Sequence, residues 1–397
     1  METHQNIDTL FCLWKKTIIG MRIVYCLPSI HVMGGLERII ILKANYLSRI
    51  GYEVCLITTE HEGENAFFEL HPAIRCYNLN IDYERNKQRP FVKKMFYFFY
   101  NRYLHTRRLR ALLNELQADV VISTFRTEMP ILPYLKDGSK KVLEFHGSRP
   151  MFKISQREGI YRWAEKLSES RFEKRIAAYD RFVVLTKAEA LDWKNCRNLS
   201  VIPNMLPEIS FSLADLSAKR VIAAGRYGSE KGFDRLIAAW ELIAQQQPDW
   251  TLHIYGEGPL RTQFEQQIER LRLNTSVFLE GETKTIEKEY AQSSIFALSS
   301  HYEGFGMVLA EAEAAGLPLV SFDVPNGPRS IIHHGENGFL VKDGDIKAYA
   351  EALLKLMDDV NLRREMGRRA YEDSRQYLPE VVMKQWTDLF EEMVRTK

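Results

Sequence analysis

The sequence predicts an α/β protein with two domains of similar size, each built on a parallel β-sheet covered by helices. Its 397 residues are enough for two or three domains with buried cores. Short β-branched runs alternate with longer helical patterns, which is typical of parallel sheets. The alternation restarts after the stretch from Pro203 to Ser217, which lacks strong periodicity. With 45% hydrophobic and 27% charged residues, the composition is that of a globular protein and excludes a disordered one.

The first domain is expected over residues 21–205. Its pattern opens with the run Arg22–Cys26, and a Gly34-Gly35 turn then starts a helix that reaches about Arg49. Two further helices are expected near 91–116 and 155–178. The predicted strands are 22–26, 54–58, 119–123, 141–145, 181–185 and 200–203.

The second domain is expected over residues 219–378, after a linker over 206–218. A helix over 379–397 then ends the chain, in a position to pack back on the first domain. The predicted strands of the second domain are 220–224, 250–255, 277–279, 295–298, 317–321 and 339–341, and its predicted helices are 232–247, one from about 259, 307–315, 345–358 and 361–375.

The first twenty residues do not fit this pattern. The apolar patch Leu10–Trp14 is followed by Lys15 and Lys16, whereas a secretory signal has its positive charges before the apolar core. We therefore expect a cytoplasmic protein in which residues 1–20 are a dispensable extension. The longest charge-free run, 23–36, is shorter than the roughly 20 apolar residues that a membrane span needs.

The cysteines and histidines indicate neither disulfides nor a metal centre. The five cysteines form no CxxC motif, and Cys26 and Cys55 lie in apolar strand-like runs, which favours reduced thiols. The ten histidines include no HExxH motif and no Cys/His ligand cluster. No metal site is therefore expected.

Charge is distributed unevenly along the chain. Residues 1–205 carry 32 Lys and Arg against 22 Asp and Glu, whereas residues 206–397 carry 22 and 30. This split suggests either an anionic partner for the first half or attraction between the two halves. Positive charge is concentrated in the stretch 85–110, which holds nine Lys and Arg, no Asp or Glu, and the aromatic run Phe96–Tyr100 followed by Tyr103.

This basic aromatic stretch, residues 85–110, has three interpretations. Basic side chains with surplus aromatic residues suit a helix lying on anionic lipid headgroups, so a membrane surface is the expected partner. Single-stranded nucleic acid would use the same residue types, and an aromatic core helix with solvated charges is the third possibility. In the expected packing Tyr97, Phe98 and Tyr100 stay available to other surfaces, and the face on the first-domain sheet consists of Val92, Phe96, Phe99 and Tyr103.

A glycine-rich segment in the second domain is the most informative motif. Gly304 and Gly306 free the backbone just before a helix begins. A helix N-terminus presents unpaired N–H groups and a positive dipole end, which suit a diphosphate or sugar hydroxyls. Glu303 is expected at the loop tip, and Glu311 about one turn into the helix, where it can accept hydrogen bonds from a ribose diol.

A second motif places two cations on a glycine-flanked turn. Arg226 and Lys231, in Gly225-Arg226…Lys231-Gly232, follow the first strand of the second domain, where cations suit pyrophosphate neutralisation. With Ile254–Pro259, Gly316-x-Pro318 and Gly335-x-x-Gly338, the two motifs resemble the second domain of the family-four retaining glycosyltransferases. That family has the GT-B architecture, in which two Rossmann-like domains face each other across a cleft.

The resemblance implies roles for individual residues of the second domain. Arg226 and Lys231 would bind the diphosphate of a nucleotide sugar donor. Contacts to the transferred sugar are implied for Glu303, Phe305, Gly306 and Met307, and contacts to the diphosphate and the ribose for Val308 and Glu311.

The first domain resembles the family more loosely. Its Gly34-Gly35-x-Glu37-Arg38 segment is similar to the family's glycine-rich loop, which implies that Gly35 lies near the donor phosphate and the acceptor. His146 is similar to the family's active-site histidine. Ser330 stands where many relatives carry Glu. The Gly327-Pro328 form of this segment is similar to that of relatives that build bacterial surface polysaccharides on lipid carriers.

These features predict a retaining glycosyltransferase with Glu303 and His146 as its catalytic residues. It is expected to move a hexose or N-acetylhexosamine from a nucleotide diphosphate sugar, UDP-linked, to a hydroxyl of a glycan or lipid-linked acceptor at the inner face of the cell membrane. No metal or other cofactor is expected, because Arg226, Lys231 and a helix N-terminus supply positive charge.

The mechanism and the function class each have alternatives. Since no first-domain carboxylate stands out as a nucleophile, a front-face reaction is favoured, in which the departing phosphate helps to deprotonate the acceptor. The alternative functions are a GT-B nucleotide-sugar epimerase and a non-enzymatic nucleic-acid-binding protein, although we expect no nucleic-acid partner.

Overall fold

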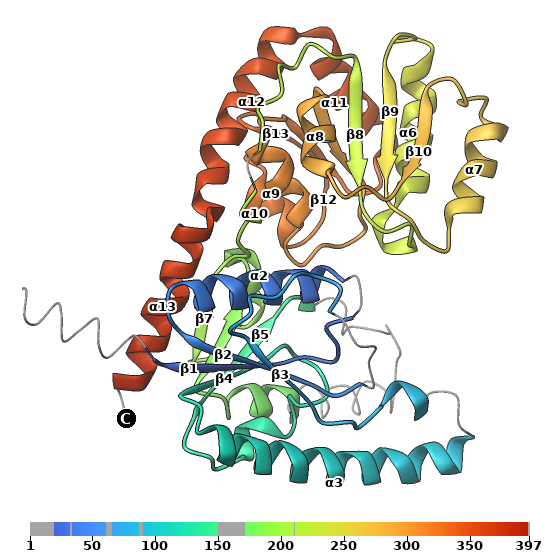
Figure 1. Ribbon diagram of the computed structural model, residues 1–397. Helices are drawn as coiled ribbons and strands as arrows, with labels where there is room; N and C mark the ends of the chain where they lie inside the picture. Colours follow the sequence, from blue (N-terminus) through green and yellow to red (C-terminus); the bar gives the residue numbers. More distant parts are fainter. Residues whose placement is uncertain are drawn as a thin grey trace, which may run out of the picture.

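The computed structural model describes residues 20–31, 34–60, 66–86, 90–149, 171–209 and 211–395. In this part of the chain two open parallel sheets form, one in each half, so the predicted α/β class with two Rossmann-like domains is confirmed. Figure 1 shows the first domain below the second. Except for Gly20, the predicted extension lies outside the described residues, as does most of the helix predicted near 155–178.

The first domain holds a seven-stranded sheet in the order β3-β2-β1-β4-β5-β6-β7, with every pair parallel. The sequence analysis missed β3, because this edge strand is short, polar and mostly exposed. The strands are β1 (Arg22–Cys26), β2 (Glu53–Thr58), β3 (Arg75–Asn78), β4 (Val120–Ser123), β5 (Lys140–Phe145), β6 (Arg181–Val184) and β7 (Leu199–Val201).

The helices of the first domain cover both faces of this sheet (Figure 1). Helix α2 starts at the predicted glycine turn and buries Ile40, Ala44 and Leu47 at helical spacing. The described helices are α2 (Gly35–Arg49), α3 (Phe91–Leu116) and α5 (Lys187–Asp192), with the short 3₁₀ turns η1 (Glu84–Asn86) and η2 (Leu132–Tyr134).

The second domain holds a six-stranded parallel sheet in the order β10-β9-β8-β11-β12-β13. Its strands are β8 (Arg220–Ala224), β9 (Thr251–Tyr255), β10 (Val277–Gly281), β11 (Ile295–Leu298), β12 (Leu319–Asp323) and β13 (Gly338–Lys342). The helices are α6 (Phe233–Ala244), α7 (Arg261–Arg270), α8 (Ile286–Ala291), α9 (Met307–Ala314), α10 (Gly327–Ile331), α11 (Ile346–Asp358), α12 (Val360–Ser374) and α13 (Pro379–Arg395), and the 3₁₀ turns are η4 (Ser229–Lys231) and η5 (Arg375–Tyr377).

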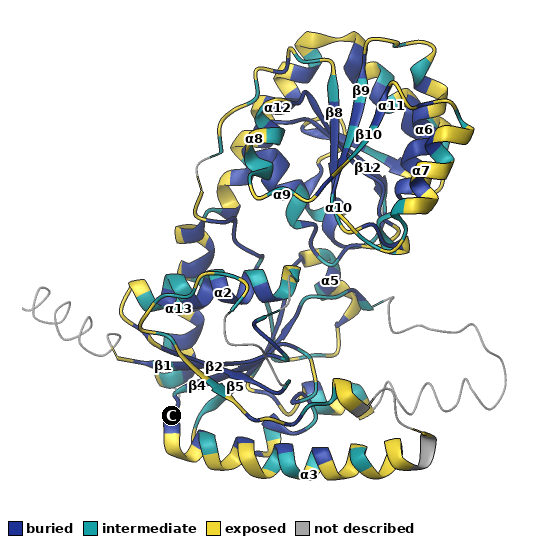
Figure 2. Cartoon of the chain, turned by 45° about the vertical axis from the view of Figure 1, so that its right-hand side comes forward, coloured by how far each residue is buried: buried dark blue, intermediate teal, exposed yellow. Residues whose placement is uncertain are grey.

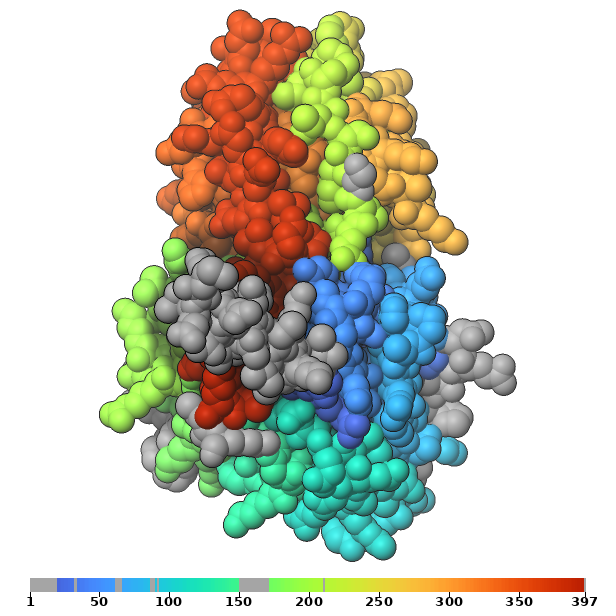
Figure 3. All heavy atoms as spheres, turned by 60° about the vertical axis from the view of Figure 1, so that its left-hand side comes forward, coloured from blue at the N-terminus to red at the C-terminus, as the bar shows by residue number. Residues whose placement is uncertain are grey.

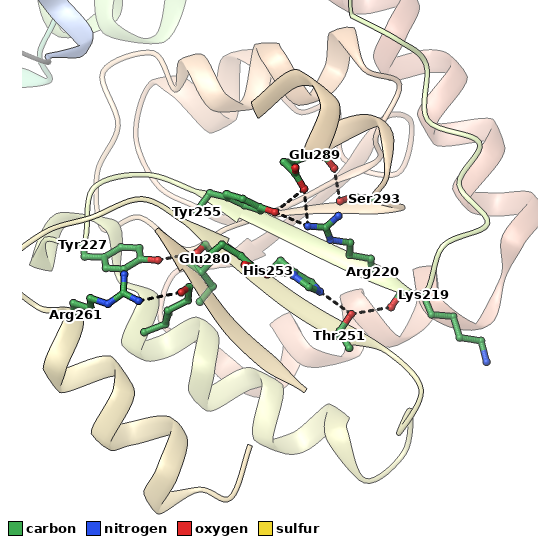
Figure 4. A network of polar contacts seen from close by, with 12 residues as sticks. Lys219, Arg220, Tyr227, Thr251, His253, Tyr255, Arg261, Glu280, Glu289 and Ser293 are labelled. Carbon is green, nitrogen blue, oxygen red and sulfur yellow. Dashed lines mark hydrogen bonds and ion pairs between the residues drawn. The ribbon is translucent and has the colours of Figure 1, made fainter. Parts of the chain in front are cut away.

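A polar network fastens α8 to the second sheet (Figure 4). Arg220 pairs with Glu289 of α8 at 2.8 Å, and both contact the hydroxyl of Tyr255 at 2.6 Å. Burial, together with the hydrogen bond to Glu289, raises the pKa of Tyr255, so the phenol stays protonated and its hydroxyl donates a hydrogen bond to the carboxylate. The next residue of the helix, Tyr290, is fully buried. The network therefore fixes the position of Tyr290.

Helix α13 leaves the second domain and ends on the first. Val382, Trp386 and Phe390 are buried in the apolar cluster that contains Ile23, Ile40 and other side chains of β1 and α2. Figure 3 shows the C-terminal segment, in red, running down one side of both domains. The core of the first domain is therefore built from two parts of the sequence that are separated by the whole second domain.

Helix α3 packs through a different face from the one expected. Phe96, Phe99 and Tyr103 are 67%, 62% and 64% exposed, so the prediction that they cover the sheet is wrong. Figure 2 shows the exposed outer side of this long helix in yellow. The side chain of Val92 lies outside the described atoms. The buried face consists of Asn101, His105, Leu109, Leu113 and Leu116.

The reason is polar anchoring in the middle of the helix. Asn101 Nδ2 donates to Ile81 O at 3.1 Å, and His105 Nδ1 lies 3.0 Å from the hydroxyl of Tyr83. Burial lowers the pKa of His105 to about 4, so it is neutral and can occupy the apolar side. In the turns just before Asn101, the side chains of Phe96, Phe98, Phe99 and Tyr100 are exposed. Among the helices that the structure describes, none is long and apolar enough to cross a membrane.

Candidate active site between the two domains

Gly304 brings the two domains into backbone contact. A Cβ added to this residue would collide with the carbonyl oxygen of His146 and lie 3.0 Å from that of Gly147. Residues 146 and 147 follow β5, at the carboxyl edge of the first sheet, whereas Gly304 follows β11 of the second. The contact therefore joins the two strand edges at which α/β sheets bind ligands, and places His146 beside the loop that carries Glu303.

Glu303 is buried in this loop and is held from two sides. Its Oε1 accepts a hydrogen bond from Ser300 Oγ at 2.7 Å and lies 2.6 Å from Lys231 Nζ. Its backbone forms a bridge with Asn326, and Gly327 N donates to Glu303 O at 3.3 Å. The carboxylate thus stands at a fixed position and already has a cationic partner.

The two predicted cations behave differently. Lys231 ends the turn η4, and its aliphatic stem lies 3.3 Å from where a Cβ of Gly225 would be. Gly232 then adopts φ +60°, and a Cβ there would collide with Ser299 O, so glycine is required. Arg226 is exposed and forms no ion pair with a described carboxylate. The structure brings Lys231 to Glu303 and leaves Arg226 facing solvent.

Glu311 is buried on α9 and bridges the two domains. Its Oε1 accepts a hydrogen bond from Arg38 Nη1 of α2 at 3.0 Å, and its Oε2 accepts one from Tyr290 OH at 3.3 Å. Burial raises the pKa of Glu311, and Arg38 opposes that shift. Each oxygen of the carboxylate expected to bind a ribose therefore already accepts one hydrogen bond from a protein donor. Arg38 was part of a predicted motif, but no local pattern predicted that Glu311 would be its partner.

The first turn of α9 holds the other predicted donor residues. Gly306 caps the helix with φ +84°, and Met307 and Val308 follow it half-buried. Phe305 is buried and packs edge-to-face on Tyr377 with ring centroids 5.3 Å apart. Its side chain belongs to the core, so only its backbone is available to a sugar.

Gly35 is exposed at the start of α2. A Cβ added there would meet nothing within 4 Å, so packing within the protein does not require glycine at this position. The role that the resemblance implies for Gly35, beside the donor phosphate and the acceptor, stays a prediction.

A buried charge cluster lies beneath His146. Nε2 of His146 is 2.9 Å from Glu144 Oε1, and Lys43 of α2 pairs with the same oxygen. Lys43 and Glu144 are 1% and 0% exposed. Although burial alone would raise the pKa of Glu144, Lys43 and His146 hold it at about 2. Sequence reasoning missed both residues, although a charge inside an apolar strand or on the apolar face of a helix is a signal that could have found them.

A second buried carboxylate, Glu189 of α5, also joins the domains. The Asn326 side chain donates to Glu189 and, at 2.8 Å, to Ser148 Oγ, while Trp193 Nε1 donates to Glu189 at 2.7 Å. Burial raises the pKa of Glu189 to about 7. Asn326 adopts φ +73°, a conformation that few residues other than Gly and Asn tolerate. These residues were also missed, because their partners lie more than 100 positions away in the sequence.

The arrangement combines Lys231, the buried Glu303 and His146 at one interdomain contact. Among the described residues, no group of three or more His, Cys, Asp and Glu side chains is placed to hold a metal ion. Lys231, exposed Arg226 and the N-terminus of α9 offer positive charge to an anionic ligand. Glu303 and His146 come from different domains, so a ligand between them would contact both.

Comparison with known proteins agrees with this geometry. Residues 33–207 match the family described as Glycosyltransferase Family 4, and residues 208–373 match the family described as Glycosyl transferases group 1. An uncharacterized glycosyltransferase of Haemophilus influenzae is 30% identical over 92% of this chain and 98% of its own length. The poly(ribitol-phosphate) alpha-N-acetylglucosaminyltransferase of Staphylococcus aureus is 30% identical over 57% of this chain and 47% of its own length.

Solved structures show the same architecture. S. aureus TarM, solved with fondaparinux, alpha-GlcNAc-glycerol and UDP, superposes with a TM-score of 0.76 at 18% identity, covering 93% of this chain and 99% of that one. At this identity the likeness concerns the fold alone. The chain spans less than two thirds of several other curated relatives. With both family patterns in order and one relative matched along nearly its whole length, this chain belongs to the family-four glycosyltransferases of GT-B architecture.

Proposed function

We propose that this glycosyltransferase moves a hexose or N-acetylhexosamine from a UDP-sugar to a hydroxyl of a glycan or lipid-linked acceptor in the synthesis of a surface polysaccharide, with retention of configuration. The observation that carries the proposal is the contact of the Glu303–Gly304 loop with His146. This contact brings the segment of Glu303 in the second domain next to His146 of the first domain. The names of the S. aureus relatives, which include UDP and an alpha-linked N-acetylglucosamine product, support this choice of donor and stereochemistry.

Charge on the departing diphosphate is the first demand of the reaction. Lys231 Nζ pairs with Glu303 Oε1 at 2.6 Å. A bound diphosphate would compete for this ammonium group, and Arg226 is exposed nearby in sequence to join it. Lys231 would then leave Glu303 charged beside the transferred sugar, where positive charge develops at the anomeric carbon. These cations and the N-terminus of α9 serve the role that a metal would otherwise fill, so the proposed reaction uses none.

Retention by a front-face route fits the positions of the first-domain carboxylates. Glu144 is enclosed and paired with Lys43, and Glu189 is enclosed and bonded to Trp193 and Asn326. Neither presents an exposed oxygen to attack an anomeric carbon. In the proposed route the departing phosphate takes the acceptor proton, and His146 orients the sugar.

The acceptor side of the proposal includes a membrane surface. Helix α3 exposes Phe96, Phe98, Phe99, Tyr100 and Tyr103 within a stretch that has no acidic residue. Aromatic side chains and cations on one projecting helix suit the interface of an anionic bilayer. We therefore place the enzyme peripherally on the cytoplasmic face of the cell membrane, where lipid-linked acceptors would be presented.

Donor and acceptor assays test this function directly. UDP-sugars are first screened for an increase in melting temperature, because a ligand that binds only the folded state stabilises it. UDP release is then measured with and without lipid-linked acceptors. Acceptor-dependent UDP release that Glu303→Gln and His146→Ala each slow by about 10²-fold or more is the expected result. Acceptor-independent formation of free nucleotide and sugar would favour an epimerase instead, and no response to any nucleotide sugar would contradict the proposal.

A further inference from the structure

The cluster of Lys43 and Glu144 is costly for the fold. Both side chains lie in the apolar layer between α2 and the first sheet, beside Tyr25 and Trp386. Removing two charges from water costs several kcal/mol each, and apolar replacements of a buried pair are often neutral or stabilising. The pair is therefore not explained by a contribution to the free energy of unfolding, and we consider a role in function.

The geometry connects the pair to His146. Glu144 and His146 are two residues apart at the end of β5, so their side chains lie on the same face of the sheet. The contact of 2.9 Å between Glu144 and His146 Nε2 is within ion-pair range but lacks hydrogen-bond alignment, so a small ring rotation would align it. A carboxylate at this position keeps a proton on Nε2, which leaves Nδ1 as the nitrogen that can serve a substrate.

Lys43 keeps the carboxylate charged and is itself covered by the C-terminal helix. Its Nζ lies 4.5 Å from the ring of Trp386 of α13, a cation–π distance, and 5.7 Å from the ring of Tyr25. Burial lowers the pKa of Lys43, and Glu144 opposes that shift. The chain of contacts therefore runs from α13 through Lys43 and Glu144 to His146, whose backbone carbonyl contacts Gly304 in the loop of Glu303.

We propose that Glu144 and Lys43 are positioning residues for His146: Glu144 fixes the orientation and the proton of the imidazole, and Lys43 holds Glu144 as the carboxylate. This inference rests on the proposed function, because it assigns His146 to the transferred sugar. It adds two residues that touch no substrate and a dependence of the site on α13.

The kinetic test uses the full chain and a double-mutant cycle. With the UDP-sugar that stabilises the protein most, Glu144→Gln should lower kcat for UDP release by about 10- to 100-fold, while the donor KM changes by less than about twofold. In a His146→Ala background the same substitution should have no further effect, because its target is gone. Equal losses in both backgrounds, or wild-type turnover in Glu144→Gln, would overturn the proposal.

Two further variants separate positioning from folding. Lys43→Met with Glu144→Leu replaces the pair by apolar groups, so this double variant should melt close to the wild type and still lose turnover. Wild-type turnover in it would overturn the proposal. Lys219→Met with Asp249→Asn is the matched control, since it removes an exposed ion pair of the second domain and should change neither quantity.

A spectroscopic readout keeps this inference distinct from the proposed function. The ¹⁵N shifts of the His146 ring report which nitrogen carries the proton, whether or not any donor is turned over. The expected result is a proton fixed on Nε2 in the wild type and a mixture of tautomers in Glu144→Gln. Identical spectra in the two proteins would refute the positioning role, whereas the expected spectra without any UDP release would refute only the proposed function.

Discussion

Removing three exposed rings from α3 should release the protein from anionic membranes. Phe96, Phe99 and Tyr103 are each about two-thirds exposed, so the triple change to Ser alters no packed contact of the sheet. Full burial of such a ring is favourable by about 1.5–3 kcal/mol, and burial of the exposed two-thirds by about 1–2 kcal/mol. Three rings then contribute about 3–6 kcal/mol, so vesicle affinity should fall at least a hundredfold.

Co-sedimentation with phosphatidylglycerol-rich vesicles measures this loss, and neutral phosphatidylcholine vesicles show how much of the binding depends on charge. Neutralising Lys93, Lys94 and Arg107 should cost about 1 kcal/mol per charge and less at high salt. Arg108 is left intact because its guanidinium bonds the carbonyls of Leu79 and Asn80. Tyr371→Ser, on α12 of the second domain, is the matched control. Undiminished vesicle binding by the triple variant would refute the membrane surface, and binding of single-stranded oligonucleotides in its place would favour the nucleic-acid interpretation.

Three further predictions concern the interdomain contact. Gly304→Ala should lower kcat/KM by about 10²-fold or more with little change in melting temperature, because its Cβ separates the domains at His146 without entering either core; wild-type kinetics would show that the contact is dispensable. Glu311→Gln should mainly raise the donor KM, because the ribose does not change during the reaction, whereas Glu303→Gln should lower kcat by about 10²-fold. Steady-state kinetics, with melting temperatures as a control for folding, measure both effects. Identical behaviour of the two variants would contradict this division of roles. Glu189 has its pKa raised to about 7 by burial, so its contribution to stability is largest below the unfolded pKa and declines as pH rises toward 7. As pH rises from the unfolded pKa toward 7, the free energy of unfolding of the wild type should fall by up to about 3 kcal/mol relative to that of Glu189→Gln and then level off. A difference that does not change with pH would place the pKa of Glu189 at its ordinary value.

The fold was predictable because its strands carry an unambiguous pattern. Runs such as Arg22–Cys26 and Arg220–Ala224 are short, largely apolar and contain β-branched residues, and Pro28 or Gly225 ends each run within two positions. β3 lacks this signal, because an edge strand needs no apolar face. The packing of α3 was not predictable, because five consecutive aromatic residues place an apolar side chain on every face of the helix. The face of α3 that packs on the sheet is determined by Asn101 and His105, two polar residues whose partners lie in the chain before the helix.

The candidate site was predictable to the extent that its residues sit in local motifs. Glu303, Lys231 and His146 each follow a strand at the carboxyl edge of its sheet, and the topology of such sheets brings them together. Arg38 and Glu311 form an ion pair across 273 positions of sequence. No local pattern reports a contact of that kind, because it depends on how closely the two domains approach each other.

The return of α13 to the first domain has a consequence for synthesis. Residues 21–205 emerge from the ribosome long before Trp386 and Phe390 are synthesised. The apolar surface of β1 and α2 in the nascent first domain therefore stays uncovered during that time. The second domain, by contrast, has its sheet and most of its helices in one contiguous segment and can fold as soon as that segment emerges. Folding should therefore finish in the opposite order to translation, and a chain that terminates before residue 379 would be a substrate for chaperones and proteases rather than a smaller enzyme.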